Sequence, residues 1–329
     1  MADAPSRLAA CLAGPRDAPA IAALSCAALD RALRAPAELT VAIATGDAVL
    51  AGAFQRVTTA VGGLASTDDA RAPGDASVFR RGSGGPAVRV GPGTVHVALA
   101  LASPSALVAC DEKRIVNRYV RPILRALTRC GHTASFTGRD WIAVAHRPAG
   151  WVGFAHDAAS RRTLVEAFVA VRTPFADAGR ASFLGKHPAT LEELAGKPVD
   201  EARIARAIVD AYAGDAPPGD LAWPGSPDAP PIVLAAAPVT VEPPWLATVD
   251  EAIGPLGAGP DASGTFRVGG DLLVSRDALA LLEARAATAP LDDLPALVDA
   301  TLGARGVALD GVKSLTSLLD VITRARRRG

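Results

Sequence analysis

The amino-acid sequence predicts an α+β protein with a mixed or antiparallel sheet packed by helices, followed by a small α+β domain at the C-terminal end. Apolar, β-branched segments occur in groups of two and three, and amphipathic helical stretches flank these groups. A Pro/Gly-rich stretch then separates the last part of the chain from the rest. We therefore expect one domain at residues 1–215, a linker at 216–231 and an accessory domain at 232–329.

The first elements follow from apolar spacing. Residues 15–34 have a helical spacing of apolar side chains, and the segments 39–44 and 48–54 predict strands. A polar Gly/Asp/Pro loop is expected at 62–75. Residues 77–81 and 94–101 then predict two strands on either side of a short arginine- and glycine-rich stretch.

A second helix is expected at 111–131, where Asp111 is a plausible N-cap and Gly131 follows the helix end. Pro122 predicts a kink or a late start of this helix. The segments "DWIAVAH", "GWVGFAHD" and "TLVEAFVAV" predict a hairpin, joined by "RPA", and a third strand. Helices at 188–196 and 199–213 complete the first domain. The accessory domain has strand signals at 232–241 and 265–274 and helical patterns at 276–288, 292–303 and 314–327.

Composition excludes several classes of partner. The 34 basic and 34 acidic residues cancel, which gives no global reason to expect binding to nucleic acid or to an anionic membrane. No apolar run approaches the roughly 20 residues of a membrane span, and no signal-peptide layout begins the sequence, so we expect a cytoplasmic protein. Four cysteines are scattered without CxxC spacing, which favours reduced thiols and predicts no structural metal.

The stretch "FRRGSGGPAV", residues 79–88, is the first candidate for chemistry. Arg80, Arg81 and Arg89 lie in a part of the sequence that has no acidic residue between Asp75 and Asp111. Adjacent glycines let the backbone approach a ligand, and guanidinium groups bind carboxylate or phosphate oxygens. The alternative is a surface hairpin with solvated arginines. A P-loop or a Rossmann turn is disfavoured, because both lead into a helix.

The second candidate is residues 138–157, "GRDWIAVAHRPAGWVGFAHD". A turn that carries Arg147 and Gly150 would present a cation to the same ligand, and Asp140 would help to hold a nucleotide-bound Mg²⁺. Asp140 can equally be a hydrogen-bonding residue at the start of a strand. His146 and His156 have no third ligand at a recognisable spacing, so the protein alone predicts no metal site.

With these motifs the sequence resembles the lipoate-protein ligases and their biotin-ligase relatives, as a divergent member. That family carries RRxSGGGAV, then a GRND-type segment, then a K-[IV]-[SA]-G turn, and "RRGSGGPAV" and "GRDW…HRPAGW" follow the same order. Residues 264–302 resemble the small accessory domain of bacterial lipoate ligases. The resemblance implies a biotin/lipoate ligase-like catalytic domain with a lipoate-ligase-like C-terminal domain.

The implied function is ATP-dependent activation of lipoate, or of a related medium-chain acid, to an acyl-AMP. Transfer of the acyl group to a lysine of a lipoyl-domain acceptor protein follows. The implied ligands are ATP with Mg and lipoate or lipoyl-AMP, with Asp140 as a possible contact of the Mg-ATP. The resemblance places substrate or nucleotide binding at Arg80, Arg81, Ser83, Gly84, Gly85, Ala87, Asp140 and Gly150.

The sequence departs from the family at two informative positions. Pro86 replaces the third glycine and removes one N–H donor. Aligned on Gly150, the catalytic lysine of the family falls at Arg147, a planar cation that does not substitute freely for lysine. Two functions therefore stay open: an enzyme with Arg147 in the catalytic position, and a catalytically degenerate paralogue that binds an acyl group, a nucleotide or a lipoyl domain. A thioester mechanism at Cys130 is a third alternative, beside a buried structural thiol.

Overall fold

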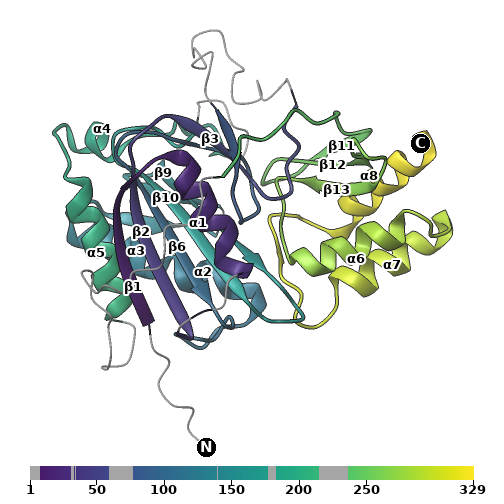
Figure 1. Ribbon diagram of the computed structural model, residues 1–329, viewed down its shortest axis with the longest axis horizontal. Coiled ribbons are helices and arrows are strands. Elements are labelled where there is room, and N and C mark those ends of the chain that lie inside the picture. Colours follow the sequence, from purple (N-terminus) through teal and green to yellow (C-terminus); the bar gives the residue numbers. More distant parts are fainter. Residues whose placement is uncertain are drawn as a thin grey trace, which may run out of the picture.

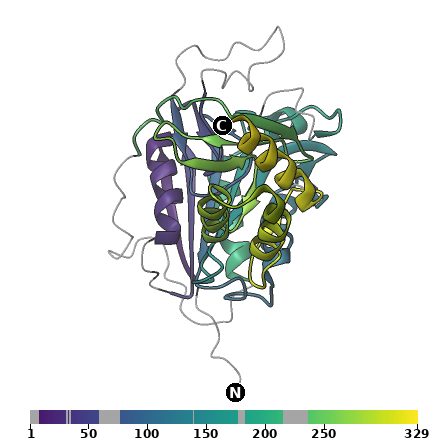
Figure 2. The ribbon, with the colours of Figure 1, turned by 90° about the vertical axis from the view of Figure 1, so that its right-hand side faces the viewer.

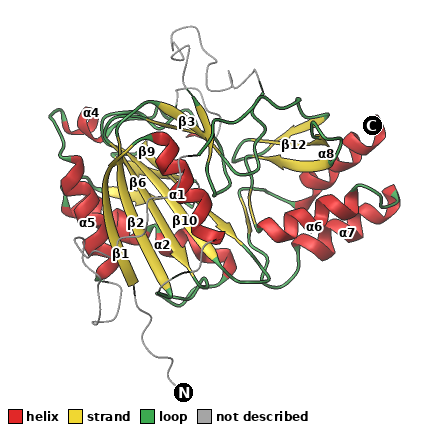
Figure 3. Cartoon of the chain, in the orientation of Figure 1, coloured by secondary structure: helices red, strands yellow, loops and turns green. Residues whose placement is uncertain are grey.

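The computed structural model describes residues 8–30, 33, 35–58, 77–138, 140–176, 183–214 and 236–329. The expected loop at 62–75 and the expected linker at 216–231 lie outside these residues. Figures 1 and 3 show a large sheet with helices on both of its faces and a smaller unit beside it that contains the C-terminus. The fold is α+β, as the sequence predicts.

The larger sheet has seven strands in the described part of the chain, in the order β1-β2-β6-β10-β9-β8-β7. β1 and β2 are parallel and are connected through helix α1, whereas the other neighbours are antiparallel. This makes the sheet mixed, because a parallel pair needs a crossover connection. The strands are β1 (Leu8–Arg16), β2 (Ala37–Ala44), β6 (Thr94–Leu101), β7 (Ala134–Phe136), β8 (Trp141–Val144), β9 (Arg147–His156) and β10 (Thr163–Ala170).

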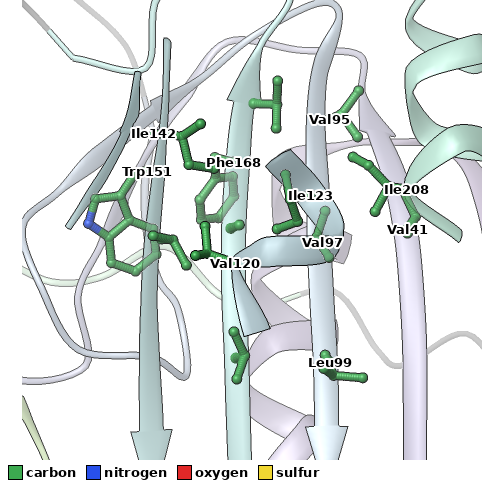
Figure 4. Close-up of a cluster of buried hydrophobic side chains, with 14 of the residues drawn as sticks. Val41, Val95, Val97, Leu99, Val120, Ile123, Ile142, Trp151, Phe168 and Ile208 are labelled. Atoms are coloured by element: carbon green, nitrogen blue, oxygen red, sulfur yellow. The ribbon is translucent and has the colours of Figure 1, made fainter. Parts of the chain in front are cut away.

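Each face of this sheet is covered differently. On one face, Val41 and Val97 pack in the same buried cluster as Ile123 and Ile208 (Figure 4). On the other face, alanines of β6 and β9 let helix α1 approach closely, with Leu29 in the contact. The helices of this half are α1 (Ala18–Asp30), α2 (Ile115–Tyr119), α3 (Arg121–Arg129), α4 (Leu191–Ala195) and α5 (Glu201–Ala213).

A second, three-stranded sheet carries the arginine- and glycine-rich stretch. Its strands are β3 (Ala48–Ala51), β4 (Val78–Arg80) and β5 (Val88–Val90), in the order β4-β3-β5. Residues 81–87, here called the glycine loop, connect β4 to β5. The predicted strand-to-strand setting of this loop is therefore confirmed, but the strand that follows it is β5, which was not predicted, and not the expected strand at 94–101.

The C-terminal unit has its own hydrophobic cluster, which includes Leu256, Leu282, Val298 and Ile322. Figure 2 shows this unit lying in front of the large sheet. Arg276 joins it to the first half through Asp157 at 3.0 Å and Asp30 at 3.1 Å. Its elements are β11 (Ala247–Asp250), β12 (Pro255–Pro260), β13 (Phe266–Gly270), β14 (Leu273–Val274), α6 (Arg276–Ala286), α7 (Leu294–Leu302), β15 (Leu309–Asp310) and α8 (Leu315–Arg328). The domain boundaries themselves stay a prediction, because the expected linker is outside the described residues.

Two local expectations are corrected. The helix expected at 15–34 begins at Ala18, and residues 8–16 form β1 instead. The alanine-rich run has no strong strand signal of its own, and its pairing with β2 decides its conformation. Residues 236–241, the described part of the expected strand at 232–241, belong to no strand, and β11 and β12 follow later.

The hairpin between β8 and β9 also differs from the expectation. Its turn is formed by Ala145 and His146, with φ of 47° and 63°, and not by residues 147–149. Arg147 is therefore the first residue of β9. The predicted break near Pro122 is confirmed, since α2 ends at Tyr119 and α3 starts at Arg121.

Candidate functional site

The glycine loop is enclosed between β9 and the C-terminal unit. Gly85 has φ of 88°, a conformation that favours glycine, and a Cβ there would collide with the indole ring of Trp151. A Cβ on Gly84 would collide with the carbonyl oxygen of Leu272 from the C-terminal unit. Glycine is thus required at both positions by close packing within the chain itself.

The backbone N–H groups of this loop are bound by protein acceptors. Gly82 donates to the hydroxyl of Ser25 at 2.7 Å, and Gly84 donates to the carbonyl of Phe154 at 3.1 Å. Gly85 donates to the carbonyl of Leu272 at 2.6 Å. These donors are the ones that the sequence predicts for a ligand, and in this structure they hold the loop in place.

Arg81 is buried and is the centre of the loop. Its Nη1 donates to the carbonyl of Leu50 at 2.7 Å, and its Nη2 donates to the carbonyls of Gly84 and Pro86 at 2.8 and 2.7 Å. The guanidinium carbon lies 4.2 Å from the centre of the Trp151 ring. A guanidinium has five N–H donors in a fixed plane, so these contacts determine its orientation.

A buried acid completes the surroundings of Arg81. Glu166 of β10 lies with Oε2 at 3.8 Å from Nε of Arg81, accepts a hydrogen bond from the Ser83 hydroxyl, and contacts Nε2 of His96 at 2.7 Å. Burial alone favours the protonated acid, but the His96 hydrogen bond and the Arg81 charge prevail and lower the pKa of Glu166. We call Arg81, Ser83, His96 and Glu166 the Glu166 network.

Sequence reasoning missed His96 and Glu166. Both lie in strands that are otherwise apolar, "TVHVALAL" and "TLVEAFVAV", and the strands are buried along their whole length. A charged residue inside such a run was the available signal, because it needs a buried partner of opposite charge. Arg80 and Arg81 are therefore paired with acids, although no acidic residue lies near them in the sequence.

Arg80 points to another part of the chain. Its Nη1 donates to the carbonyls of Gln55 at 2.6 Å and Gly52 at 3.1 Å. Its Nη2 forms an ion pair of 2.9 Å with Glu242, a residue of the C-terminal half.

Arg147 lies at the far end of β9, beside α4. Its Nη1 pairs with Glu193 at 2.7 Å, and its Nε and Nη2 donate to the carbonyls of His187 and Pro188 at 3.1 and 2.9 Å. Gly150 follows on the same strand, where a Cβ would press on the carbonyl oxygen of Phe168. In the part of the chain that the structure describes, the hydrogen bonds and the ion pair of Arg147 are made with α4 and the residues just before it.

Asp140 belongs to a cavity at the seam between the two halves. The cavity has a volume of about 250 Å³, and Ile253, Leu273, Asp310 and Lys313 also line it. The structure thus brings Arg81, Ser83, Gly84 and Gly85 together, with Ala87 leading into β5, whereas Arg147 lies beside α4 and Asp140 lines the cavity at the seam.

The residues of the loop do not fit Mg-ATP in this conformation, because Arg81 and the glycine N–H groups are bound by the chain. Among the described residues, no three His, Cys, Asp or Glu side chains are grouped as metal ligands. No helix in the described ranges is long and apolar enough to span a membrane. Cys130 ends α3, as the sequence predicts, and burial raises the pKa of its thiol, which disfavours a nucleophilic thiolate.

Comparison with known structures identifies the fold of this chain. The Plasmodium falciparum protein LipL1, solved in complex with lipoate, is 10% identical in sequence and has a TM-score of 0.59. The match covers 97% of this chain and 100% of LipL1. The fold is that of the lipoate-protein ligases. The recognised resemblance and the predicted fold class are therefore confirmed at the level of the fold.

Two further matches have lower scores. A bipartite lipoate protein ligase from Thermoplasma acidophilum, described with its E2 lipoyl domain, is 13% identical, with a TM-score of 0.45 over 64% of this chain and 84% of that chain. A biotin protein ligase from Aquifex aeolicus, in complex with biotin and ATP, is 10% identical, with a TM-score of 0.35 over 64% and 69%. No protein-family model matches the sequence, and no curated protein matches it.

Proposed function

We propose that this chain uses the lipoate-ligase fold as a non-catalytic binding protein for an anionic ligand of the lipoate or nucleotide type. The pairing of Arg81 with Glu166 inside the protein supports the non-catalytic part of this proposal, and the likeness to LipL1, solved in complex with lipoate, supports the class of ligand. A site that activates a carboxylate on ATP needs cations and N–H donors directed at the phosphate, where charge develops in the transition state. Here the corresponding groups are directed at acceptors of the chain.

Releasing Arg81 for a phosphate would be costly. Both Arg81 and Glu166 have side chains with 0% exposure, so withdrawing the guanidinium leaves a buried carboxylate without its cation. Breaking a buried ion pair in this way typically costs about 3–5 kcal/mol. Substrate binding would have to supply that free energy before any chemistry starts.

The position of the family lysine supports the same proposal. Arg147 occupies it by alignment, and its guanidinium is held by Glu193 and two carbonyls beside α4. A cation that bridges an acid and a phosphate must reach both of them, whereas this guanidinium, at the start of β9, is directed at α4 and the residues before it.

Pyrophosphate release tests the proposal. Purified protein is incubated with Mg-ATP and either lipoate or octanoate, next to the variants Arg81→Ala and Arg147→Ala. We expect the protein to release no more pyrophosphate than the two variants do. In calorimetry we expect it to bind at least one of the acids or the nucleotide saturably. Release that depends on the added acid and is lost in both variants would overturn the proposal.

Ligase activity is the second candidate function. The full-length likeness to LipL1, at 97% and 100% coverage, favours it. Under this proposal ATP activates lipoate or a related medium-chain acid, Arg147 acts in place of the family lysine, and the acyl group passes to a lysine of a lipoyl domain in the cytoplasm. Transfer of radiolabelled octanoate to a lipoyl domain, observed only with ATP, separates this function from the first.

A further inference from the structure

Residues 236–246, here called the strap, lead into the C-terminal unit along the surface of the first half. Backbone hydrogen bonds attach the strap at three points. Ala236 donates to the carbonyl of Pro19 at 3.1 Å, and Val239 donates to the carbonyl of Val78 at 2.8 Å. Near its end, the N–H of Glu242 donates to the carbonyl of Val57 at 2.7 Å.

Two donors converge on one carboxylate oxygen of the strap. Oε2 of Glu242 accepts hydrogen bonds from Nη2 of Arg80 and from the backbone N–H of Val57, each at 2.9 Å. A guanidinium next to a backbone N–H is an arrangement that proteins use to bind carboxylates and phosphates. The chain itself thus shows that an anion is bound at this point.

The donors are held in place independently of the Glu242 side chain. Nη1 of Arg80 is fixed by the carbonyls of Gln55 and Gly52, which leaves Nη2 directed at the strap. Val57 follows the same turn, and its carbonyl is bound by the strap backbone. Arg56 lies nearby, with its guanidinium carbon 3.7 Å from the centre of the Trp245 ring, and its Nη1 and Nη2 donate to backbone carbonyls of residues 243, 244 and 259.

We propose that Nη2 of Arg80 and the N–H of Val57 form a binding site for an external carboxylate or phosphate monoester, which Glu242 occupies as an internal competitor. This inference rests on the proposed binding function and names a site for its anionic ligand. The side chains of Arg80 and Glu242 are 30% and 31% exposed, so an external anion can reach the pair. Partly exposed ion pairs are weaker than fully buried ones, and an anion that brings further contacts displaces the glutamate.

Occupancy by Glu242 lowers the apparent affinity of the site. The apparent dissociation constant is the intrinsic one divided by the fraction of molecules in which the site is open. Glu242→Gln removes the competing charge and keeps the length of the side chain. We expect it to strengthen binding of inorganic phosphate or octanoate by roughly 5- to 10-fold, as for a site that is open about 10–20% of the time.

Isothermal titration calorimetry of the full chain tests this site with inorganic phosphate and octanoate as separate probes. The matched control is Glu201→Gln, which removes the acid of another exposed pair, Arg172 and Glu201, at 2.5 Å. We expect tighter binding in Glu242→Gln, unchanged binding in Glu201→Gln, and loss of the gain when Arg80→Gln is added. Thermal unfolding of each variant shows that it is folded, and the probe that gains more affinity identifies the ligand class.

Three outcomes would overturn the inference: equal affinity in Glu242→Gln and the original protein, a gain that survives Arg80→Gln, or no binding of either probe to any folded variant. These outcomes do not depend on the pyrophosphate assay. A protein that releases pyrophosphate contradicts the non-catalytic function and leaves the competition at Arg80 to be measured separately. If no pyrophosphate is released and Glu242→Gln binds the probes with the same affinity as the original protein, only the role of Glu242 is contradicted.

Discussion

The carboxylate of Glu166 and the guanidinium of Arg81 lie 3.8 Å apart, and neither side chain is exposed. Glu166 comes from the middle of β10, whereas Arg81 directly follows β4. Their pairing fixes the glycine loop to the large sheet, because Arg81 also binds the carbonyls of Gly84 and Pro86 within the loop. An arginine that resembles a ligand-binding residue in sequence therefore has a structural role.

Arg81→Met is expected to lower the free energy of unfolding by about 3–5 kcal/mol, since it leaves the Glu166 charge buried without its cation. Glu166→Gln keeps the shape of the side chain and leaves the Arg81 charge buried, but three backbone carbonyls still accept hydrogen bonds from that guanidinium, so the cost should be lower, about 1–3 kcal/mol. Urea denaturation of both variants measures the difference. Costs below about 1 kcal/mol for both would show that the pair does not stabilise the loop.

The Glu166 network also predicts an acid dependence of stability. The pKa of Glu166 is below its ordinary value of 4.5 in the folded protein, so its stabilising contribution is present above that value. The contribution is lost as the pH falls below about 4.5 and through the folded pKa. We expect the difference in Tm between the original protein and Glu166→Gln to be constant from pH 7 to 5 and to shrink below pH 4.5. A difference in Tm that stays constant down to pH 3 would contradict this prediction.

Local patterns predicted the elements whose signals are contained in their own residues. The strand at 94–101 is found with these bounds, and the helices expected at 199–213 and 276–288 are found within two residues. The fold class followed from the grouping of strands. β1 was missed because its alanines carry no periodic signal, and the turn at Ala145 and His146 was missed because neither residue usually adopts positive φ.

The candidate site was predictable only in part. The motif located the glycine loop and its strand-to-strand connection, because glycine and arginine are informative locally. The partners of its cations were not predictable, since Glu166 and Glu242 lie 85 and 162 positions from Arg81 and Arg80. Only the fold brings these acids to the loop, and they change the interpretation from a vacant cationic site to a self-neutralised one.

Gly85→Ala tests the close packing of the glycine loop on Trp151. The matched control is Gly131→Ala, because Gly131 has a similar φ of 95° but nothing within 4 Å of an added Cβ. Both changes carry the strain of positive φ, about 1–2 kcal/mol. We expect Gly85→Ala to cost about 1–3 kcal/mol more, because the methyl group must displace the indole ring. Urea denaturation, followed by tryptophan fluorescence, measures the free energy of unfolding of both variants. Equal losses would show that the Trp151 ring moves aside without a measurable cost.

Arg147→Lys tests whether the replacement of the family lysine by arginine is what prevents activation of the acid by ATP. Lysine cannot reproduce the planar contacts to Glu193, His187 and Pro188, but the site is partly exposed, so the expected loss of stability is below about 1 kcal/mol. We expect no acid-dependent pyrophosphate release from this variant, because Arg81 stays paired with Glu166 whichever cation stands at position 147. Arg172→Lys, at another exposed ion pair, controls for the loss of a guanidinium. Release from Arg147→Lys alone would show that the Glu166 network leaves the glycine loop competent for adenylation and that one substitution separates this chain from a ligase.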